Sequence, residues 1–283
     1  METPQELLAE LGLINPDTVI PFYPKVRDRD DVSVLKDETS GVIFLSRMDH
    51  MDISHYEEMQ GVSYWSAKDR KETLQLTLED DRRRARQFSS LVRGKNYIDI
   101  GCGAGGVLDQ LRDTAKGLAG VEPQEYIRAE LSKQGYTMSR LASDVPKRSF
   151  DVASLFHVLE HITTPLETLK QTRGLLCKGG RVIVEVPHAR DALLKLESFK
   201  GFTLWSEHIV LYTRQTLQKL LEHAGFKDVH VEGFQRYPLA NHIGWLVYGK
   251  PGGQNTIHIT APEYKELLTS TDQTDTIIAT ATA

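Results

Sequence analysis

The sequence has few cysteines, no long apolar run and no excess of charge of one sign. Its two cysteines, Cys102 and Cys177, are too few for a disulfide framework or a four-cysteine zinc site. No segment approaches the roughly 20 uninterrupted apolar residues of a transmembrane helix. The first residues, METPQELLAELGL, lack the basic start and apolar run of a signal peptide. These absences predict a cytoplasmic protein without a membrane partner.

The charge balance narrows the function classes further. Lys and Arg number 34 and Asp and Glu number 39, which gives a net charge of −5 over 283 residues. Such a chain has no general electrostatic attraction for nucleic acid, so no nucleic-acid partner is expected. The length fits one large domain or two small ones.

The sequence pattern divides the chain into three parts. Residues 1–76 read as an irregular N-terminal cap or lid region. Over residues 77–250 strand-like runs alternate with amphipathic helices, which predicts an α/β fold with a parallel sheet covered on both faces. The Thr/Ala-rich tail over residues 251–283 is expected to be partly disordered.

Several elements can be placed by residue. A helix is expected over Thr77–Val92, with Arg82–Arg84 on its solvated face. Thr213 is expected to cap a later helix that Gly225 ends. Four further strands and one short helix are expected, namely the strands TVIPFYPKV, GVIFLSRM, DVHVEGFQRY and GWLVYGK and the helix ELLAELGL.

The most informative segment is IDIGCGAGG, in which a strand runs into a glycine-rich turn that opens a helix. Gly101, Gly103 and Gly106 match the G-x-G-x-x-G pattern of dinucleotide sites, and Glu122 lies about 20 residues further on. An NAD-dependent oxidoreductase therefore stays open here. Asp99, two residues before the first glycine, argues against it, because a carboxylate suits a cationic ligand better than a pyrophosphate.

An ordered set of motifs extends this segment: DIGCGAGG, VEP, SD and FDVASLFHVLEHITTPLETLKQTRGLLCKGGRVIVEVP. From about Tyr97 to Lys250 the chain resembles the class I S-adenosylmethionine (AdoMet)-dependent methyltransferases. The resemblance implies a Rossmann-like, seven-stranded, mostly parallel sheet with an antiparallel last strand. It implies S-adenosyl-L-methionine as cofactor, bound by Asp99, Gly101, Cys102, Gly103, Gly105, Glu122, Pro123, Asp144, Val145, Phe156, His157 and His161.

The resemblance also implies roles for some of these residues. Asp99 and the Gly101–Gly105 loop hold the methionine part, and Glu122 takes both ribose hydroxyls. Asp144 and Val145 flank the adenine. Phe156 and His157 end the fourth strand beneath the cofactor, and His161 lies near the substrate mouth. A binding protein on this fold that performs no reaction is the competing hypothesis.

The segment HVLEH matches H-x-x-E-H, an inverted zinc-peptidase pattern. That chemistry needs His157 and His161 on one face of a helix. Because the segment follows the strand-like run FDVASLF, residues 156–159 are expected to be extended, and no metal is expected. Hydrogen-bonded structural roles for both histidines stay open.

Methyl transfer to oxygen or nitrogen needs at most a general base, and transfer to carbon needs a base that makes a carbanion. His208, in the segment WSEHIVLY, is the first candidate, because histidine titrates near working pH. His188 is a second candidate, with Glu185 placed to orient a substrate, and His157 at the strand end is a third. Structural roles for these histidines stay open.

The segment WSEHIVLY is similar to one in methyltransferases that act on nucleotide-linked sugars and surface polysaccharides. This similarity implies O-methylation of a small polar acceptor, namely a sugar or nucleotide-sugar hydroxyl, with N- or C-methylation of another metabolite left open. Many such proteins begin with a cysteine-rich zinc module, which this chain lacks. Tyr64 and Trp65 are expected in a lid over the site or, alternatively, in the core of the cap. A homodimer stays open, and no Asn/Asp-Pro-Pro-Tyr-type motif of nucleic-acid methyltransferases follows the fourth strand.

Overall fold

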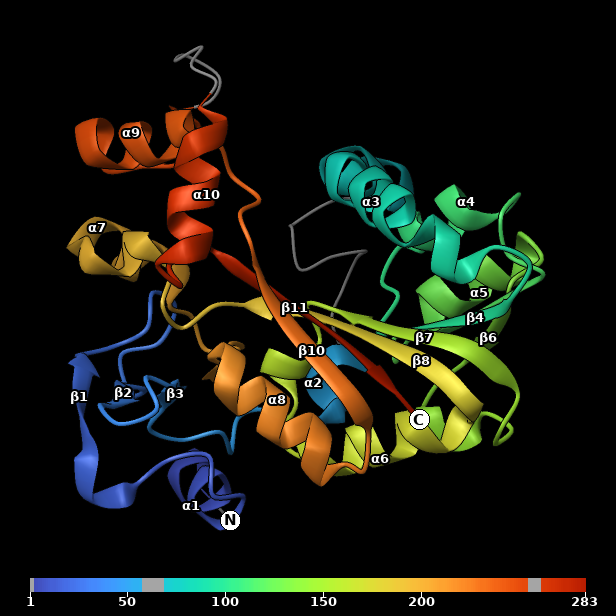
Figure 1. Ribbon diagram of the computed structural model, residues 1–283, viewed down its shortest axis with the longest axis horizontal. Helices are drawn as coiled ribbons and strands as arrows, with labels where there is room; N and C mark the ends of the chain where they lie inside the picture. Colours follow the sequence, from blue (N-terminus) through green and yellow to red (C-terminus); the bar gives the residue numbers. More distant parts are fainter. Residues whose placement is uncertain (1–2, 58–68, 254–260) are drawn as a thin grey trace.

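The computed structural model describes residues 3–57, 69–253 and 261–283. A seven-stranded sheet lies at its centre (Figure 1), in the order β10-β11-β8-β7-β4-β5-β6. Its strands in chain order are β4 (Asn96–Ile100), β5 (Gly117–Val121), β6 (Thr137–Ser139), β7 (Phe150–Phe156), β8 (Leu176–Pro187), β10 (Lys227–Phe234) and β11 (Thr276–Thr282).

Strand direction confirms the expected α/β fold class. The strands β6, β5, β4, β7 and β8 pair in parallel, as the alternation of strand and helix predicted. The last strand in the chain, β11, runs antiparallel to both of its neighbours, β8 and β10. The carboxyl ends of β4, β5 and β7 therefore meet at one edge, where ligands bind in open sheets of this kind.

Helices cover both faces of this sheet, as Figure 1 shows. Side chains alternate along each strand, so Tyr97 packs with the helices on one face while Ile98 packs with those on the other. One face carries α3 (Arg70–Val92), α4 (Gly106–Leu111) and α5 (Glu125–Lys133), and the other carries α6 (Pro165–Leu175) and α8 (Arg214–His223).

A second, smaller sheet joins the N-terminal region to the rest of the chain. Its order is β1-β2-β3-β9, and β9 comes from the C-terminal half. Ile43 pairs with Leu211, and Phe44 pairs with Val210. The first three strands, of which two were expected, are β1 (Val19–Tyr23), β2 (Val34–Asp37) and β3 (Ile43–Leu45); β9 is Val210–Leu211, and the nearby helices are α1 (Pro4–Glu10) and α2 (Ile53–Glu57).

The predicted division into 1–76, 77–250 and 251–283 stays a prediction, but two of its details change. The helix expected from Thr77 begins at Arg70, where Asp69 caps it by accepting a hydrogen bond from the backbone N–H of Glu72. The cap region is also tied into the methyltransferase-like region through β9.

The prediction of a partly disordered tail is wrong for residues 276–282. They form β11, which lies inside the sheet between the edge strand β10 and β8. The strand expected at GWLVYGK was also wrong, because this segment belongs to the helix α9 (Leu239–Tyr248). The antiparallel partner of β10 is therefore β11. The Thr/Ala composition of β11 suits a buried, tightly paired strand as well as a loose tail, so composition misled the prediction.

The two ends of α8 agree with the sequence prediction. Thr213 caps α8 as expected, and Gly225 follows its end with a φ of +89°. Among the residues that the structure describes, no helix combines the length and apolarity needed to cross a bilayer. The other helices are α7 (Glu197–Thr203), α10 (Pro262–Ser270) and the 3-10 helices Pro16–Thr18, Ala142–Asp144, Leu159–His161 and Ala192–Lys195.

Candidate active site

The glycine loop connects β4 to α4 at the carboxyl edge of the sheet. Gly101, Gly103 and Gly105 have φ values of +70°, +48° and +73°, which residues with a Cβ rarely adopt. A Cβ on Gly101 would also lie 2.5 Å from Cγ2 of Val158. The backbone N–H groups of Gly101 and Cys102 both donate to the carbonyl of Val121 in β5. Glycine is thus required here by both backbone conformation and space.

Glu122 follows β5 directly, and its carboxylate faces this loop. Its Oε2 accepts a hydrogen bond from the N–H of Gly103 at 3.0 Å, and its Oε1 accepts one from the N–H of Gln124 at 3.0 Å. The residue is 1% exposed, and burial raises its pKa to about 7. Two of the four lone-pair directions of the carboxylate are used, so both oxygens can accept one more hydrogen bond.

Asp99, near the end of β4, is the second buried carboxylate at this edge. It is 3% exposed, and its Oδ1 accepts a hydrogen bond from the Ser154 hydroxyl at 2.6 Å. Burial raises its pKa to about 7. Within residues 69–253 and the other described segments, neither Asp99 nor Glu122 forms an ion pair. Two buried carboxylates without a cationic partner fit a positively charged ligand such as AdoMet.

The other predicted cofactor residues have mixed surroundings. Asp144 is exposed and caps its own 3-10 helix by accepting from the N–H of Leu141, while Val145 is buried. Phe156 ends β7 and stacks on Phe88 with ring centroids 6.0 Å apart. Pro123 and Cys102 are half-buried, and burial of the Cys102 thiol raises its pKa.

His157 does not continue the strand, so the expected extended conformation was right for Phe156 but wrong for residues 157–159. Pairing of β7 with β8 ends at Phe156, and His157 has a φ of +54°. Its Nδ1 lies 3.0 Å from Glu160 Oε1, and its Nε2 lies 3.4 Å from Glu185 Oε1. Burial disfavours the imidazolium, but hydrogen bonds to both carboxylates outweigh it and raise the pKa of His157.

Glu185 forms the centre of a buried ion-pair cluster with Arg83 and Arg84 of α3. Arg83 Nη2 lies 2.8 Å and Arg84 Nη2 lies 2.7 Å from Glu185 Oε1. The expectation that Arg82–Arg84 is a solvated face was therefore wrong for Arg83 and Arg84, although Arg82 is exposed. Glu185 is 0% exposed, so the cluster, and not a substrate, uses its carboxylate.

His188 faces the C-terminal segment. Its Nδ1 lies 3.0 Å from the carbonyl oxygen of Thr274, and its Nε2 lies 3.6 Å from Asp272 Oδ1. Burial lowers its pKa to about 4. These neighbours do not belong to the predicted site residues, so a catalytic role of His188 stays a prediction that its contacts do not support.

His161 and His208, which were predicted for different roles, lie side by side. Their ring centroids are 5.0 Å apart, and Trp205 packs against both rings. The backbone N–H of Ile209 donates to the Glu160 carbonyl at 2.8 Å, which ties the segment before β9 to the 3-10 helix after β7. Burial lowers the pKa of both histidines.

Sequence reasoning missed several residues around these histidines. Nε2 of His55 in α2 lies 3.1 Å from Glu207 Oε1, and the ring of Tyr56 lies 6.3 Å from that of His161. No short-range pattern signals a contact between residues so distant in the sequence. The predicted lid residues Tyr64 and Trp65 lie outside the described residues.

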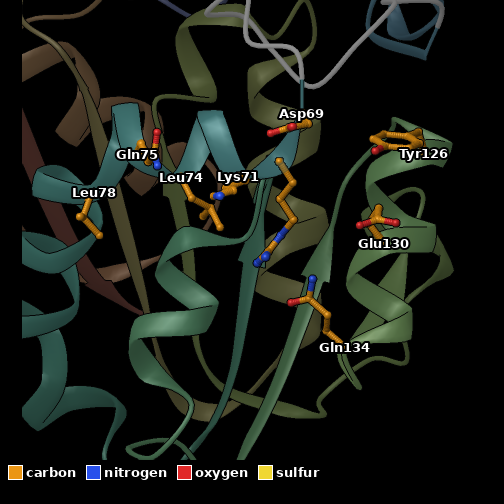
Figure 2. Close-up of a pocket in the computed structure, with 9 residues that line it drawn as sticks. Asp69, Lys71, Leu74, Gln75, Leu78, Tyr126, Glu130 and Gln134 are labelled. Atoms are coloured by element: carbon orange, nitrogen blue, oxygen red, sulfur yellow. The ribbon is translucent and has the colours of Figure 1, made fainter.

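A surface groove of about 510 Å³ lies between α3 and α5, beside the glycine loop. Figure 2 shows Tyr126 and Glu130 of α5, and Gln134 just after it, across from side chains of the first turns of α3. Arg70, which also lines the groove, donates from Nε to the Ala104 carbonyl at 2.8 Å. The groove therefore flanks the loop, but the predicted cofactor residues do not line it.

Known proteins resemble this chain over the region that contains the glycine loop and most of the residues described above. Residues 55–231, more than half of the chain, match a family model described as "Methyltransferase domain". The "Ubiquinone biosynthesis O-methyltransferase" of Stutzerimonas stutzeri is 25% identical over 151 residues, which cover 49% of this chain and 63% of that protein. The "tRNA U34 carboxymethyltransferase" of Colwellia psychrerythraea is 24% identical over 206 residues, covering 62% and 64%.

The chain thus spans less than two thirds of the length of these curated relatives. A solved SAM-dependent methyltransferase from Archaeoglobus fulgidus aligns with a TM-score of 0.52 at 18% identity, covering 72% of this chain and 94% of that one. At this identity the likeness concerns the fold, and it agrees with the sheet order described above.

Proposed function

Because this chain belongs to the methyltransferase domain family, we propose that it transfers a methyl group from AdoMet to a small polar acceptor. The observation that carries the proposal is the pair of buried carboxylates, Asp99 and Glu122, on either side of the glycine loop. The family favours this cofactor over NAD, for which a carboxylate at Asp99 is unsuitable.

The cofactor supplies a methyl group already activated on a sulfonium, so the protein acts mainly by positioning. Glu122 binds both ribose hydroxyls through its two oxygens, which is a bidentate, charge-assisted contact. Asp99 faces the cationic methionine part beside the loop, and Val145 offers a buried apolar surface for the adenine.

We propose that the acceptor binds beyond the end of β7, and the contact between His161 and His208 there supports this position. The name of the ubiquinone O-methyltransferase relative supports oxygen as the accepting atom. A sugar or nucleotide-sugar hydroxyl rests on the segment Trp205–Tyr212 alone, and neither curated relative reported above is named for a sugar. A homodimer and a cytoplasmic location stay predictions.

Calorimetric titration tests the cofactor assignment. The protein is titrated with AdoMet, with S-adenosylhomocysteine and with NAD. We expect micromolar binding of both adenosyl ligands and none of NAD; transfer of label from methyl-labelled AdoMet to a panel of hydroxylated acceptors then tests the acceptor class. Binding of NAD alone would contradict the proposal and indicate an NAD-dependent oxidoreductase.

Replacement of Glu122 should weaken AdoMet binding selectively. Glu122→Ala removes the acceptor of two hydrogen bonds to a charged group, and we expect about 10- to 100-fold weaker binding. Glu122→Gln keeps the shape and should lose less. Glu125→Ala, an exposed residue three positions away, serves as control and should bind like the parent protein. An unchanged affinity in a folded Glu122→Ala protein would remove Glu122 from the site.

The affinity for AdoMet should also depend on pH. Burial holds the pKa of Asp99 and of Glu122 at about 7 in the free protein, and a cationic ligand favours their ionised forms. Affinity should therefore rise as pH increases toward about 7 and level off above it. The free protein should behave in the opposite way: carboxyl groups with raised pKa contribute stability below their unfolded pKa values, and this contribution is lost as pH rises through about 7.

The measurement is the shift in unfolding temperature that AdoMet causes, taken at pH values on both sides of 7. The shift should be larger on the alkaline side. Glu122→Gln cannot ionise at this position and should flatten the profile. An equal shift at all pH values in the parent protein would contradict the assignment of these pKa values to the cofactor site.

A further inference from the structure

Four side chains beyond the end of β7 form a cluster, hereafter the His161–His208 cluster: Glu160, His161, Glu207 and His208. Ligand atoms of Glu160, His161 and His208 all lie within 4.8 Å of one another. His161 Nε2 lies 3.9 Å from Glu160 Oε1, and His161 Nδ1 lies 3.9 Å from Glu207 Oε2. The two imidazoles and Glu160 therefore face a common point, and Glu207 lies beside the Nδ1 atom of His161.

In the described part of the chain, the carboxylates of Glu160 and Glu207 each have a hydrogen-bond partner for only one of their two oxygens. Glu160 and Glu207 are 0% and 5% exposed. Glu160 Oε1 faces His157, and Glu207 Oε1 faces His55, but the Oε2 atom of each is buried and has no hydrogen-bond partner among the described residues. Buried carboxylate oxygens are rarely left unpaired, because their desolvation is not compensated.

The two buried negative charges of the cluster favour binding of a cation. Among the described residues, the ion-pair partners of Glu160 and Glu207 are all histidines, and the structure gives them no Lys or Arg partner. Two buried negative charges beside His161 and His208 leave a deficit that one divalent cation balances.

Neighbouring residues hold the side chains of the cluster in place, as outer residues do around known metal sites. One oxygen of Glu160 is held by His157, and one oxygen of Glu207 is held by His55. The backbone hydrogen bond from Ile209 to Glu160 keeps His208 beside Glu160 and His161. Outer partners of this kind orient metal ligands and are needed for affinity.

We propose that Glu160, His161 and His208 bind a divalent first-row transition metal such as Zn²⁺, with Glu207 beside the other ring nitrogen of His161 as an outer partner. Imidazole and carboxylate ligands together suit zinc, iron, cobalt or nickel better than magnesium or calcium. Zinc ligands lie about 2.1 Å from the metal, so the ligand atoms of a tetrahedral site are about 3.4 Å apart. The ligand atoms lie within 4.8 Å of one another, so metal binding requires these side chains to move closer together.

This site differs from the zinc-peptidase arrangement considered for HVLEH. His157 and His161 do not share a helix face; His157 holds Glu160 from outside, and the second histidine ligand comes from residue 208. The inference goes beyond the proposed methyl transfer. With a metal bound, His208 is a ligand and not a free base, and the metal would lie at the proposed acceptor side.

Metal binding is measured directly on the full chain, freed of any affinity tag and treated with chelator. Zn²⁺ is titrated by calorimetry, and Co²⁺ is added as a spectroscopic probe of tetrahedral nitrogen and oxygen ligation. We expect a single equivalent of either ion. His161→Ala and His208→Ala should lose at least about 100-fold in affinity, and His55→Ala, which removes an outer partner, about 10-fold. His230→Ala is the control, because this side chain is 73% exposed and remote in sequence.

The proposal is wrong if the parent protein binds neither ion, or if His208→Ala binds as tightly as His230→Ala. Should His208→Ala fail to fold, Glu160→Gln removes the charge of a ligand with almost no change of shape and should still weaken binding. AdoMet titration of the same samples separates the two hypotheses, since the metal ligands and the Asp99–Glu122 pair are different residues.

Discussion

A chain that lacks residues 276–283 is expected to show no cooperative unfolding transition. These residues form β11, which pairs with β8 on one side and β10 on the other. Ile277, Ile278 and Ala279 are fully buried between the two helical layers. The deletion removes a strand from the interior of the sheet and exposes the paired edges of two others, a loss that far exceeds typical folding stabilities of about 5–15 kcal/mol.

A graded variant keeps this prediction quantitative. Ile277→Ala should lower the free energy of unfolding by about 2–5 kcal/mol, the cost of a buried cavity. Leu246→Ala, at a residue 67% exposed on α9, should change it by less than about 0.5 kcal/mol. Denaturant unfolding followed by circular dichroism measures all three proteins. If the shortened chain unfolds like the parent, β11 is dispensable.

Glu185→Ala is expected to destabilise the fold by about 3–5 kcal/mol, because it leaves buried charge uncompensated. Arg83 and Arg84 both bind this carboxylate, and its hydrogen bond to His157 is lost as well. Burial would raise the pKa of Glu185, but Arg84 and His157 hold it well below the usual value. The destabilisation therefore applies wherever the carboxylate is ionised in the parent protein.

A double variant separates a structural role from substrate binding. Replacing Arg84 together with Glu185 by leucine removes one of the two arginine charges that Glu185→Ala leaves without this partner, and part of the lost stability should return. Glu232→Ala, at a half-exposed carboxylate, is the control. The alternative expectation was that Glu185 orients a substrate; in that case Glu185→Ala would raise the KM for the acceptor and leave the unfolding free energy nearly unchanged.

The central strands and the glycine loop could be read from the sequence because their signals are local. An apolar run, a glycine turn and a following helix lie within a few residues of one another, as at Ile98–Gly106. The placement of Glu122 opposite the loop follows from the parallel sheet, since β4 and β5 end at the same edge. Asp99 could be predicted as a site residue for the same reason.

The rest depends on contacts between distant segments. The charged sequence around Arg84 is typical of a helix face exposed to solvent. The burial of Arg84 is explained only by its ion pair with Glu185 of β8. The β-structure of residues 276–282 is invisible in their composition, because it comes from pairing with β8. The His161–His208 cluster likewise needs the hydrogen bond between Ile209 and Glu160 before its residues can be seen as a group.

The position of β11 also dictates the order of events during synthesis. When β8 emerges from the ribosome, β7 is already available as its neighbour, but β11 follows only after residues 188–275 have been added. Until then β8 presents an open, apolar edge that strands of other nascent chains can pair with. A chaperone that covers such edges would therefore improve the yield of this protein during translation more than during refolding of the complete chain.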